Sequence, residues 1–251
     1  MESAIRSATG ALVNIQGATA FVTGANRGLG LAFVQELVAS GAQRVYAGMR
    51  DPDNFRDASA VVTPVRVDVN DPQSVEAAAA QCGDVNLLVN NAGIARVMES
   101  TLDSGWIDEA RAIFETNFFG LVRATQAFAP LIAARGGGAI VNVLSDATWF
   151  ARPMLSAYAA SKSAAWSYTN ASRIELAAQR IQVLAMHVGF LDTDLTAGFE
   201  FKKTDPRFAA RQVLAALQAD EAEALVDAGT HTIKNSLSDK RPYYLDVPEI
   251  V

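Results

Sequence analysis

The stretch Thr19-Ala20-Phe21-Val22-Thr23-Gly24-Ala25-Asn26-Arg27-Gly28-Leu29-Gly30 decides the fold of this 251-residue chain. A short apolar strand pattern runs directly into a glycine-rich turn, and a helical pattern follows it. Glycines between a buried strand and a helix let a pyrophosphate approach backbone N–H groups at the positive end of the helix. We therefore predict a dinucleotide-binding turn. Its expected contacts are Gly24, Asn26, Arg27, Gly28, Leu29 and Gly30, with the glycines spaced Gly-x-x-x-Gly-x-Gly rather than Gly-x-Gly-x-x-Gly.

Further strand patterns follow this unit, and helical patterns separate them. The strand patterns cover residues 44–49, 61–67, 85–89, 139–144 and 183–188. Regular alternation implies right-handed crossovers and a parallel sheet with helices on both faces. The predicted fold is α/β, a single Rossmann-type doubly wound sheet over residues 18–251. We expect a flexible extension over residues 1–17 and a substrate lid near 194–207.

Composition narrows the class of protein. Hydrophobic residues make up 50% of the chain, and the net charge is −6 without a basic cluster, which argues against a nucleic-acid partner. The single cysteine, Cys82, excludes an internal disulfide, and His187 and His231 lie in no metal-binding or nucleophile motif, so no metal is expected. No apolar run approaches the ~20 residues that span a bilayer. The expected protein is cytoplasmic, with a small-molecule partner and no membrane partner.

The ends of the second and third strands bear on the cofactor. The second strand ends without the carboxylate that binds an unphosphorylated ribose, and Arg50 follows instead. Together with Arg27 it could hold a 2′-phosphate, which favours NADP(H) over NAD; the alternative is an exposed strand-end charge. Asp68 after the third strand either accepts from the adenine amino group or caps the next helix, for which Asp71 is the favoured cap.

Two amide-bearing segments follow. Asn90 and Asn91 precede Ala92 and Gly93, where small residues allow close backbone approach and the amides can tie strand ends together. Asn117 lies among apolar residues of a long helical pattern, about 106–134. A buried amide must find partners. Here it either bonds to a kinked backbone or holds a buried water.

Tyr158 and Lys162 lie four residues apart and therefore on one face of a predicted helix. A neighbouring cation favours the phenolate and lowers the pKa of a phenol. Ser145 ends a strand pattern, where open α/β sheets place their ligands. The alternative for the pair is a core ring beside a solvated ammonium. With Ser145 beside it, the pair predicts an acid–base site.

In this order and spacing the motifs resemble the short-chain dehydrogenase/reductase family, with the resemblance covering about residues 18–193. It implies an NAD(P)-dependent oxidoreductase that acts on a carbonyl or secondary alcohol. Tyr158 would be the acid or base, Lys162 would hold the nicotinamide ribose, and Ser145 would bind the substrate oxygen. Asn117 would hold a water in a proton relay. The carbonyl-reductase-like, NADP-preferring members are the most similar.

The resemblance also assigns cofactor contacts. Besides the glycine turn these are Arg50, Asp68, Val69, Asn91, Ala92, Gly93, Tyr158, Lys162, Gly189, Leu191 and Thr193. Val188-Gly189 replaces the Pro-Gly that is common in the family, so this loop loses a fixed φ. After a helical pattern near 208–217, the carboxyl-terminal region also departs from the usual final strand. A homodimer or homotetramer is expected.

The expected substrate contacts are Ser145, Trp149, Met154, Tyr158 and Phe190. Their apolar character favours a hydrophobic ketone or aldehyde. Phe199 and Phe201 would belong to the lid, while Arg96 and Arg152 are expected to be solvent-exposed rather than anchors for an anion. Two alternatives are a dehydrogenase that works mainly toward oxidation and an NAD(P)-binding sensor or scaffold without turnover.

Overall fold

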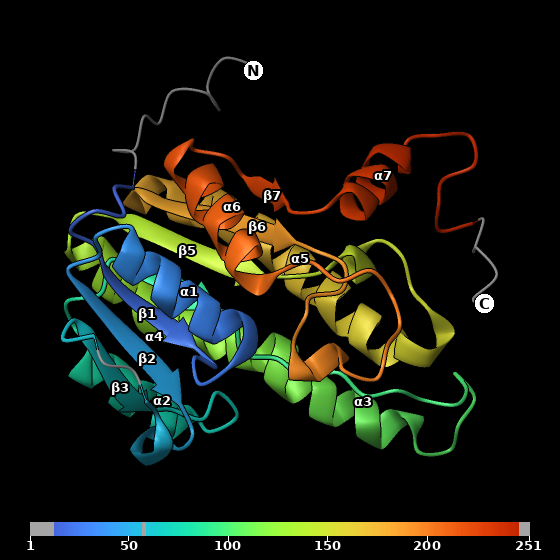
Figure 1. Ribbon diagram of the computed structural model, residues 1–251, viewed down its shortest axis with the longest axis horizontal. Helices are drawn as coiled ribbons and strands as arrows, with labels where there is room; N and C mark the ends of the chain where they lie inside the picture. The colour runs from blue at the N-terminus through green and yellow to red at the C-terminus, as the bar shows by residue number, and fades with distance from the viewer. Residues whose placement is uncertain (1–12, 57–58, 246–251) are drawn as a thin grey trace.

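A parallel β-sheet forms the centre of the computed structural model, which describes residues 13–56 and 59–245 (Figure 1). Within these residues the sheet has seven strands, in the order β3-β2-β1-β4-β5-β6-β7. They are β1 (Thr19–Thr23), β2 (Arg44–Met49), β3 (Val62–Arg66), β4 (Leu87–Asn90), β5 (Gly138–Val143), β6 (Ile181–His187) and β7 (Glu223–Leu225). The order reverses between β1 and β4, where doubly wound sheets form a ligand crevice. The predicted fold class is confirmed.

Helices cover both faces of the sheet. Helices α1 (Gly28–Ala39) and α6 (Pro206–Gln218) lie on one face, and α2 (Pro72–Gln81), α4 (Gly120–Ala134) and α5 (Ser156–Leu176) lie on the other (Figure 1). Helices α3 (Trp106–Phe114) and α7 (Ala228–Ser236) lie toward the carboxyl ends of the strands. No helix among the described residues is long and apolar enough to cross a membrane.

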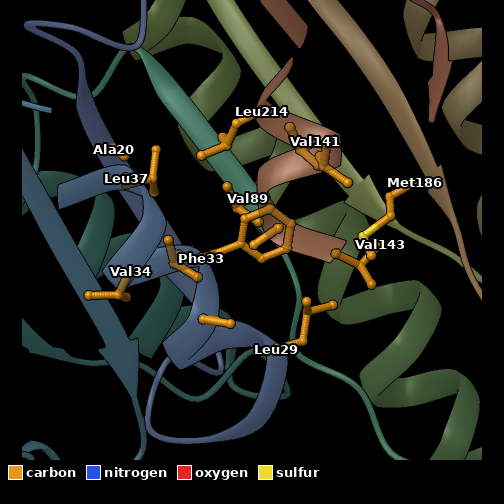
Figure 2. Close-up of a cluster of buried hydrophobic side chains, with 14 of the residues drawn as sticks. Ala20, Leu29, Phe33, Val34, Leu37, Val89, Val141, Val143, Met186 and Leu214 are labelled. Carbon is orange, nitrogen blue, oxygen red and sulfur yellow. The ribbon is translucent and has the colours of Figure 1, made fainter. Parts of the chain in front are cut away.

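The core beneath α1 and α6 is a continuous apolar layer. Figure 2 shows Phe33 and Leu37 of α1 and Leu214 of α6 packed over Val89 and Val141 of the sheet. Successive strand residues point to opposite faces, so the intervening residues supply the second layer beneath α2, α4 and α5. Strands buried on both faces explain the nearly continuous apolar runs in the sequence.

The packed domain begins earlier than predicted. Ile15 is fully buried in the layer beneath α1, and the Gly17 N–H donates to the Gly41 carbonyl at 2.9 Å. Ile15 and Gly17 thus pack against the domain, ahead of the predicted start at residue 18. A single apolar residue outside a periodic pattern does not reveal its burial in the sequence. The rest of the expected extension, residues 1–12, and the chain end, 246–251, lie outside the described residues.

Two segments differ in detail from the sequence patterns. The expected helix over 106–134 contains a π-helical turn, Glu115–Phe119, between α3 and α4. Such turns occur frequently at functional sites. The carboxyl-terminal region forms β7, which pairs in parallel with β6, and then α7, whose N-cap Asp227 accepts from the Thr230 N–H.

Candidate active site

A cleft at the carboxyl edge of the sheet collects the residues expected to bind a dinucleotide. Its lining includes Gly24, Asn26, Arg27, Gly28, Leu29, Gly30, Arg50, Asp68, Val69, Asn91, Ala92, Gly93, Tyr158, Lys162, Gly189, Leu191 and Thr193. Each of them was singled out in the sequence. The lining residues that the sequence did not single out include Met49, Asn70, Thr116, Val143 and Leu195. These belong to no motif, and only their position next to motif residues could have indicated them.

The glycine turn leaves no room for side chains at its inner face. Gly24 and Gly28 have φ of +65° and +54°, and a Cβ on Gly30 would lie 2.2 Å from the Gly24 carbonyl oxygen. The Asn91 amide donates to the carbonyls of Thr23 at 2.9 Å and Gly24 at 3.2 Å, which fixes the turn against β4. No side chain caps the first turn of α1. This cradle of backbone N–H groups fits a pyrophosphate.

The two arginines are placed differently. Arg50 is exposed and lines the cleft. Arg27 also lines it, but its guanidinium pairs with Asp194 at 2.6 Å, on the loop that follows β6. Asp68 accepts from the Asn70 N–H at 3.0 Å. Asp71 is the N-cap of α2, as favoured from the sequence.

Lys162 and Tyr158 occupy one face of α5, with the ammonium 5.6 Å from the centroid of the phenol ring. Lys162 Nζ donates to the Val143 carbonyl at 2.8 Å. Burial raises the pKa of Tyr158 to about 12 and lowers the pKa of Lys162 to about 8. Burial dominates at both residues because it disfavours each charged form, and the lowering of the Tyr158 pKa that was expected from the ammonium does not occur.

Ser145 is held on several sides at the end of β5. Its hydroxyl donates to Asp146 Oδ1 at 3.0 Å, lies 3.3 Å from the Val188 carbonyl, and accepts from the Ala147 N–H. The Ser145 hydroxyl also acts on Tyr158, because it favours the phenolate and so opposes the rise in the tyrosine pKa. Ser145 and Tyr158, thirteen residues apart in sequence, are thus brought together.

Behind Ser145, His187 has a structural role. Its Nδ1 lies 3.1 Å from the Ser145 carbonyl, and its ring is fully buried and stacked on Trp149 at 4.0 Å. Burial lowers the pKa of His187 to about 4. The ring is accordingly neutral at pH 7. His231, which belongs to no motif, is exposed.

Asn117 lies in the π-helical turn, and the backbone of Ile94 engages its amide. Oδ1 accepts from the Ile94 N–H at 2.8 Å, and Nδ2 donates to the Ile94 carbonyl at 2.9 Å and to Ser161 Oγ at 3.1 Å. Of the two expected arrangements, the structure shows backbone bonding, although to a segment distant in sequence. Asn117 therefore links α3 and α4 to the loop after β4 and to α5.

The other amides tie strand ends together as predicted. Asn90 Nδ2 donates to Asn142 Oδ1 at 2.8 Å, which joins β4 to β5, and Asn91 joins β4 to β1. The loop with Val188 and Gly189 is also fixed without a proline, because the Gly189 N–H donates to Asp227 Oδ2 at 2.8 Å.

Most of the residues expected to contact the substrate do not line the cleft. Among the described residues, Ser145, Trp149, Met154 and Phe190 are not part of the cleft lining. Trp149 stacks on His187, and the Met154 carbonyl accepts from the Met98 N–H. Phe190 packs on Phe199 and Phe201, with ring centroids 5.2 and 4.6 Å away.

Arg152 is not solvent-exposed, contrary to the prediction. Its side chain is 16% exposed, lies 3.8 Å from Asp146, and is placed over the rings of Phe150, Phe190 and Phe201. Cation–π contacts between segments distant in sequence have no local pattern. Arg96, in contrast, is exposed and pairs with Glu109.

The fold and the cleft are typical of nucleotide-binding α/β proteins, and Tyr158 and Lys162 line that cleft. Comparison with known proteins identifies the family. The family model for short chain dehydrogenases matches residues 18–203. A galactitol 2-dehydrogenase (L-tagatose-forming) from Cereibacter sphaeroides is 36% identical over 193 residues, which cover 72% of this chain and 74% of that protein.

Solved structures of related proteins support the same family. A short chain dehydrogenase from Burkholderia cenocepacia in complex with NADP is 37% identical, has a TM-score of 0.87, and the match covers 91% of this chain and 96% of that one. A Burkholderia phymatum enzyme in complex with NAD, at 22% identity and a TM-score of 0.79, shows the same fold over 89% and 95% of the two chains. The chain belongs to the short-chain dehydrogenase family of oxidoreductases, whose members bind a nicotinamide cofactor and small-molecule substrates.

Proposed function

We propose that this protein is an NADP(H)-dependent oxidoreductase that interconverts a hydrophobic ketone or aldehyde and the corresponding alcohol. The observation that carries this proposal is the meeting of Ser145, Tyr158 and Lys162 beside a cleft lined by the expected nucleotide contacts. The glycine turn fits a dinucleotide because no side chain caps the first backbone N–H groups of α1. When bound there, the cofactor supplies or accepts the hydride.

The proton chemistry belongs to the protein. The hydroxyl of Tyr158 donates its proton to the substrate oxygen during reduction, and the phenolate of Tyr158 accepts a proton from the substrate hydroxyl during oxidation. Ser145 donates a hydrogen bond to the substrate oxygen. Lys162 supplies the nearby positive charge that the phenolate needs, and its pKa of about 8 allows it to hold a proton at pH 7. Asn117 positions the loop after β4 through Ile94 and is proposed to support a relay through water.

Arg50 supports the preference for NADP(H), because it lines the cleft with an exposed guanidinium at the end of β2. The Burkholderia cenocepacia relative that holds NADP agrees, while the relative that holds NAD is more distant. An Arg50→Asp variant should bind NADPH at least tenfold more weakly and NADH equally or better, since a phosphate would meet a carboxylate. Fluorescence titration with both cofactors measures this, and an unchanged preference would leave Arg50 as a surface charge.

The proposal also includes an apolar substrate, a homo-oligomeric assembly and a cytoplasmic location. Rings of Phe190, Phe199 and Phe201 lie at the β6 end and favour an apolar substrate. An apolar surface groove between α3 and α5, lined in part by Trp106, Ile107, Phe114 and Phe119, supports a homodimer or homotetramer. The single cysteine is a buried free thiol, which suits a cytoplasmic enzyme.

The decisive experiment replaces the proposed acid. Tyr158→Phe should lower kcat at least about a hundredfold, the usual contribution of a general acid, and leave NADPH binding intact. Tyr168→Phe, on the same helix, is the matched control and should keep its activity. A panel of apolar aldehydes and ketones with NADPH, and of alcohols with NADP⁺, measures turnover in both directions. Full activity in Tyr158→Phe would refute the mechanism, and binding without turnover would favour the sensor hypothesis.

A further inference from the structure

The hydroxyl proton of Ser145 is engaged by a neighbouring carboxylate. Ser145 Oγ donates to Asp146 Oδ1 at 3.0 Å, and the Val188 carbonyl, at 3.3 Å, is a second and longer acceptor for the same proton. A serine hydroxyl has one proton, and the proposed function requires that proton on the substrate oxygen. A carbonyl substrate and the ionised carboxylate of Asp146 are both acceptors, so they compete for it. A protonated Asp146 could instead donate to Ser145 Oγ and leave the serine proton for the substrate.

The surroundings of Asp146 favour the protonated form of its carboxyl group. The residue is buried, and the Arg152 guanidinium lies 3.8 Å from Oδ2, beyond hydrogen-bonding distance. A Cβ placed on Gly189 would lie 3.6 Å from Asp146 Oδ2 and 3.5 Å from Asp227 Oδ2, so a second carboxylate is near. Burial first, and then the charge of Asp227, raises the pKa of Asp146, while Arg152 and Ser145 oppose this rise.

The other ionisable side chains near Asp146 have partners other than its carboxylate. On α5, Lys162 Nζ donates to the Val143 carbonyl. From β6, His187 Nδ1 contacts the Ser145 carbonyl. On α7, Lys234 pairs with Glu223 at 2.7 Å. The charges that act on Asp146 are therefore those of Arg152 and Asp227, and Tyr158 is the titratable group coupled to it.

We propose that Asp146 is a positioning residue that decides whether the Ser145 hydroxyl can donate to the substrate. With Asp146 protonated, the chain of donors runs from the carboxyl to Ser145 Oγ and from Ser145 to the carbonyl oxygen. With Asp146 ionised, Oδ1 retains the serine proton, and carbonyl binding is weakened. This inference rests on the proposed function, because it assigns the serine proton to a carbonyl substrate.

The first test is the pH profile of kcat/KM for carbonyl reduction with NADPH. In the wild type it should fall about tenfold as Asp146 ionises, since hydrogen bonds to a charged acceptor are stronger by about that factor. Asp146→Asn, whose amide donates at every pH, should lose this limb. Arg152→Gln should move the limb to higher pH, because the cation that favours the carboxylate is gone. Asp192→Asn, an exposed loop carboxylate, is the charge-matched control and should keep the wild-type profile.

The second test needs no turnover. The charge of Asp146 raises the pKa of Tyr158, so Asp146→Asn should shift the phenolate absorbance of Tyr158 to lower pH. The difference from the same titration of Tyr158→Phe isolates this tyrosine. Asp146→Ser replaces the asparagine variant if that variant does not fold. An unshifted titration, or an unchanged pH limb in Asp146→Asn, would overturn the role of Asp146. A wild-type protein that turns over none of the substrates would overturn the proposed function. The titration would still show whether the charge of Asp146 acts on Tyr158.

Discussion

Gly30→Ala tests the cradle that the glycine turn forms. The added methyl would lie 2.2 Å from the Gly24 carbonyl oxygen and 2.6 Å from Asn91 Nδ2, whereas real Cβ contacts essentially never fall below 3.0 Å. The turn must therefore move by at least 0.8 Å (3.0 − 2.2) relative to α1. The nearest atom is the Gly24 backbone oxygen, so a rotamer change cannot relieve this contact.

The expected cost follows from this displacement. Overpacking of this kind costs about 1–3 kcal/mol, and we expect the upper half of that range because the Asn91 hydrogen bonds to Thr23 and Gly24 are strained as well. For a chain of this size, that corresponds to a fall in Tm of about 4–12 °C. Cofactor affinity should fall at least tenfold, since one lost hydrogen bond to a charged phosphate costs about 1.5–3 kcal/mol.

The assay pairs thermal unfolding with fluorescence titration of NADPH. Gly83→Ala is the matched control, because a Cβ there meets nothing within 4 Å. Its Tm and NADPH affinity should equal those of the wild type. A Gly30→Ala variant with wild-type Tm and wild-type NADPH affinity would refute the cradle and the placement of the pyrophosphate.

Two further predictions concern stability. Ile15→Ala should lower the free energy of unfolding by about 2–5 kcal/mol in urea denaturation, whereas Leu102→Ala, at an exposed residue, should have little effect; equal stabilities would place Ile15 outside the core. Burial lowers the pKa of His187 from 6.5 to about 4, so the unfolded chain binds more protons in that window. Stability should therefore be full above about pH 6.5 and fall by up to about 3 kcal/mol toward pH 4. His187→Gln should flatten that dependence between pH 4 and 6.5, and an unchanged slope would show that another group is responsible.

The placement of the predicted site follows from a simple geometric rule. Gly24, Arg50, Asp68, Asn91 and Gly189 come from five different strand ends, yet all line one cleft. Carboxyl ends of parallel strands meet at one edge of the sheet, so strand order and motif order together place them. That Tyr158 and Lys162 share one face of a helix followed from helical periodicity, while their assignment to a site also needed Ser145.

Contacts between distant side chains were not accessible in this way. Arg152 was expected in solvent and lies among three rings, and Arg27 was expected beside Arg50 and pairs with Asp194. A long side chain can reach several partners from one backbone position, so its choice depends on the packing of segments far away in sequence. The π-helical turn that holds Asn117 likewise gave no sign in the apolar pattern.

The sequence by itself determined the alternation of strands and helices, the glycine turn and the motif residues that line the cleft, because each of these depends on local periodicity and on short motifs. Only the tertiary structure decided that Ile15 belongs to the core and that Asp146 accepts a hydrogen bond from Ser145. Both depend on burial, which is set by what the whole fold places around a residue rather than by the residue's neighbours in the chain.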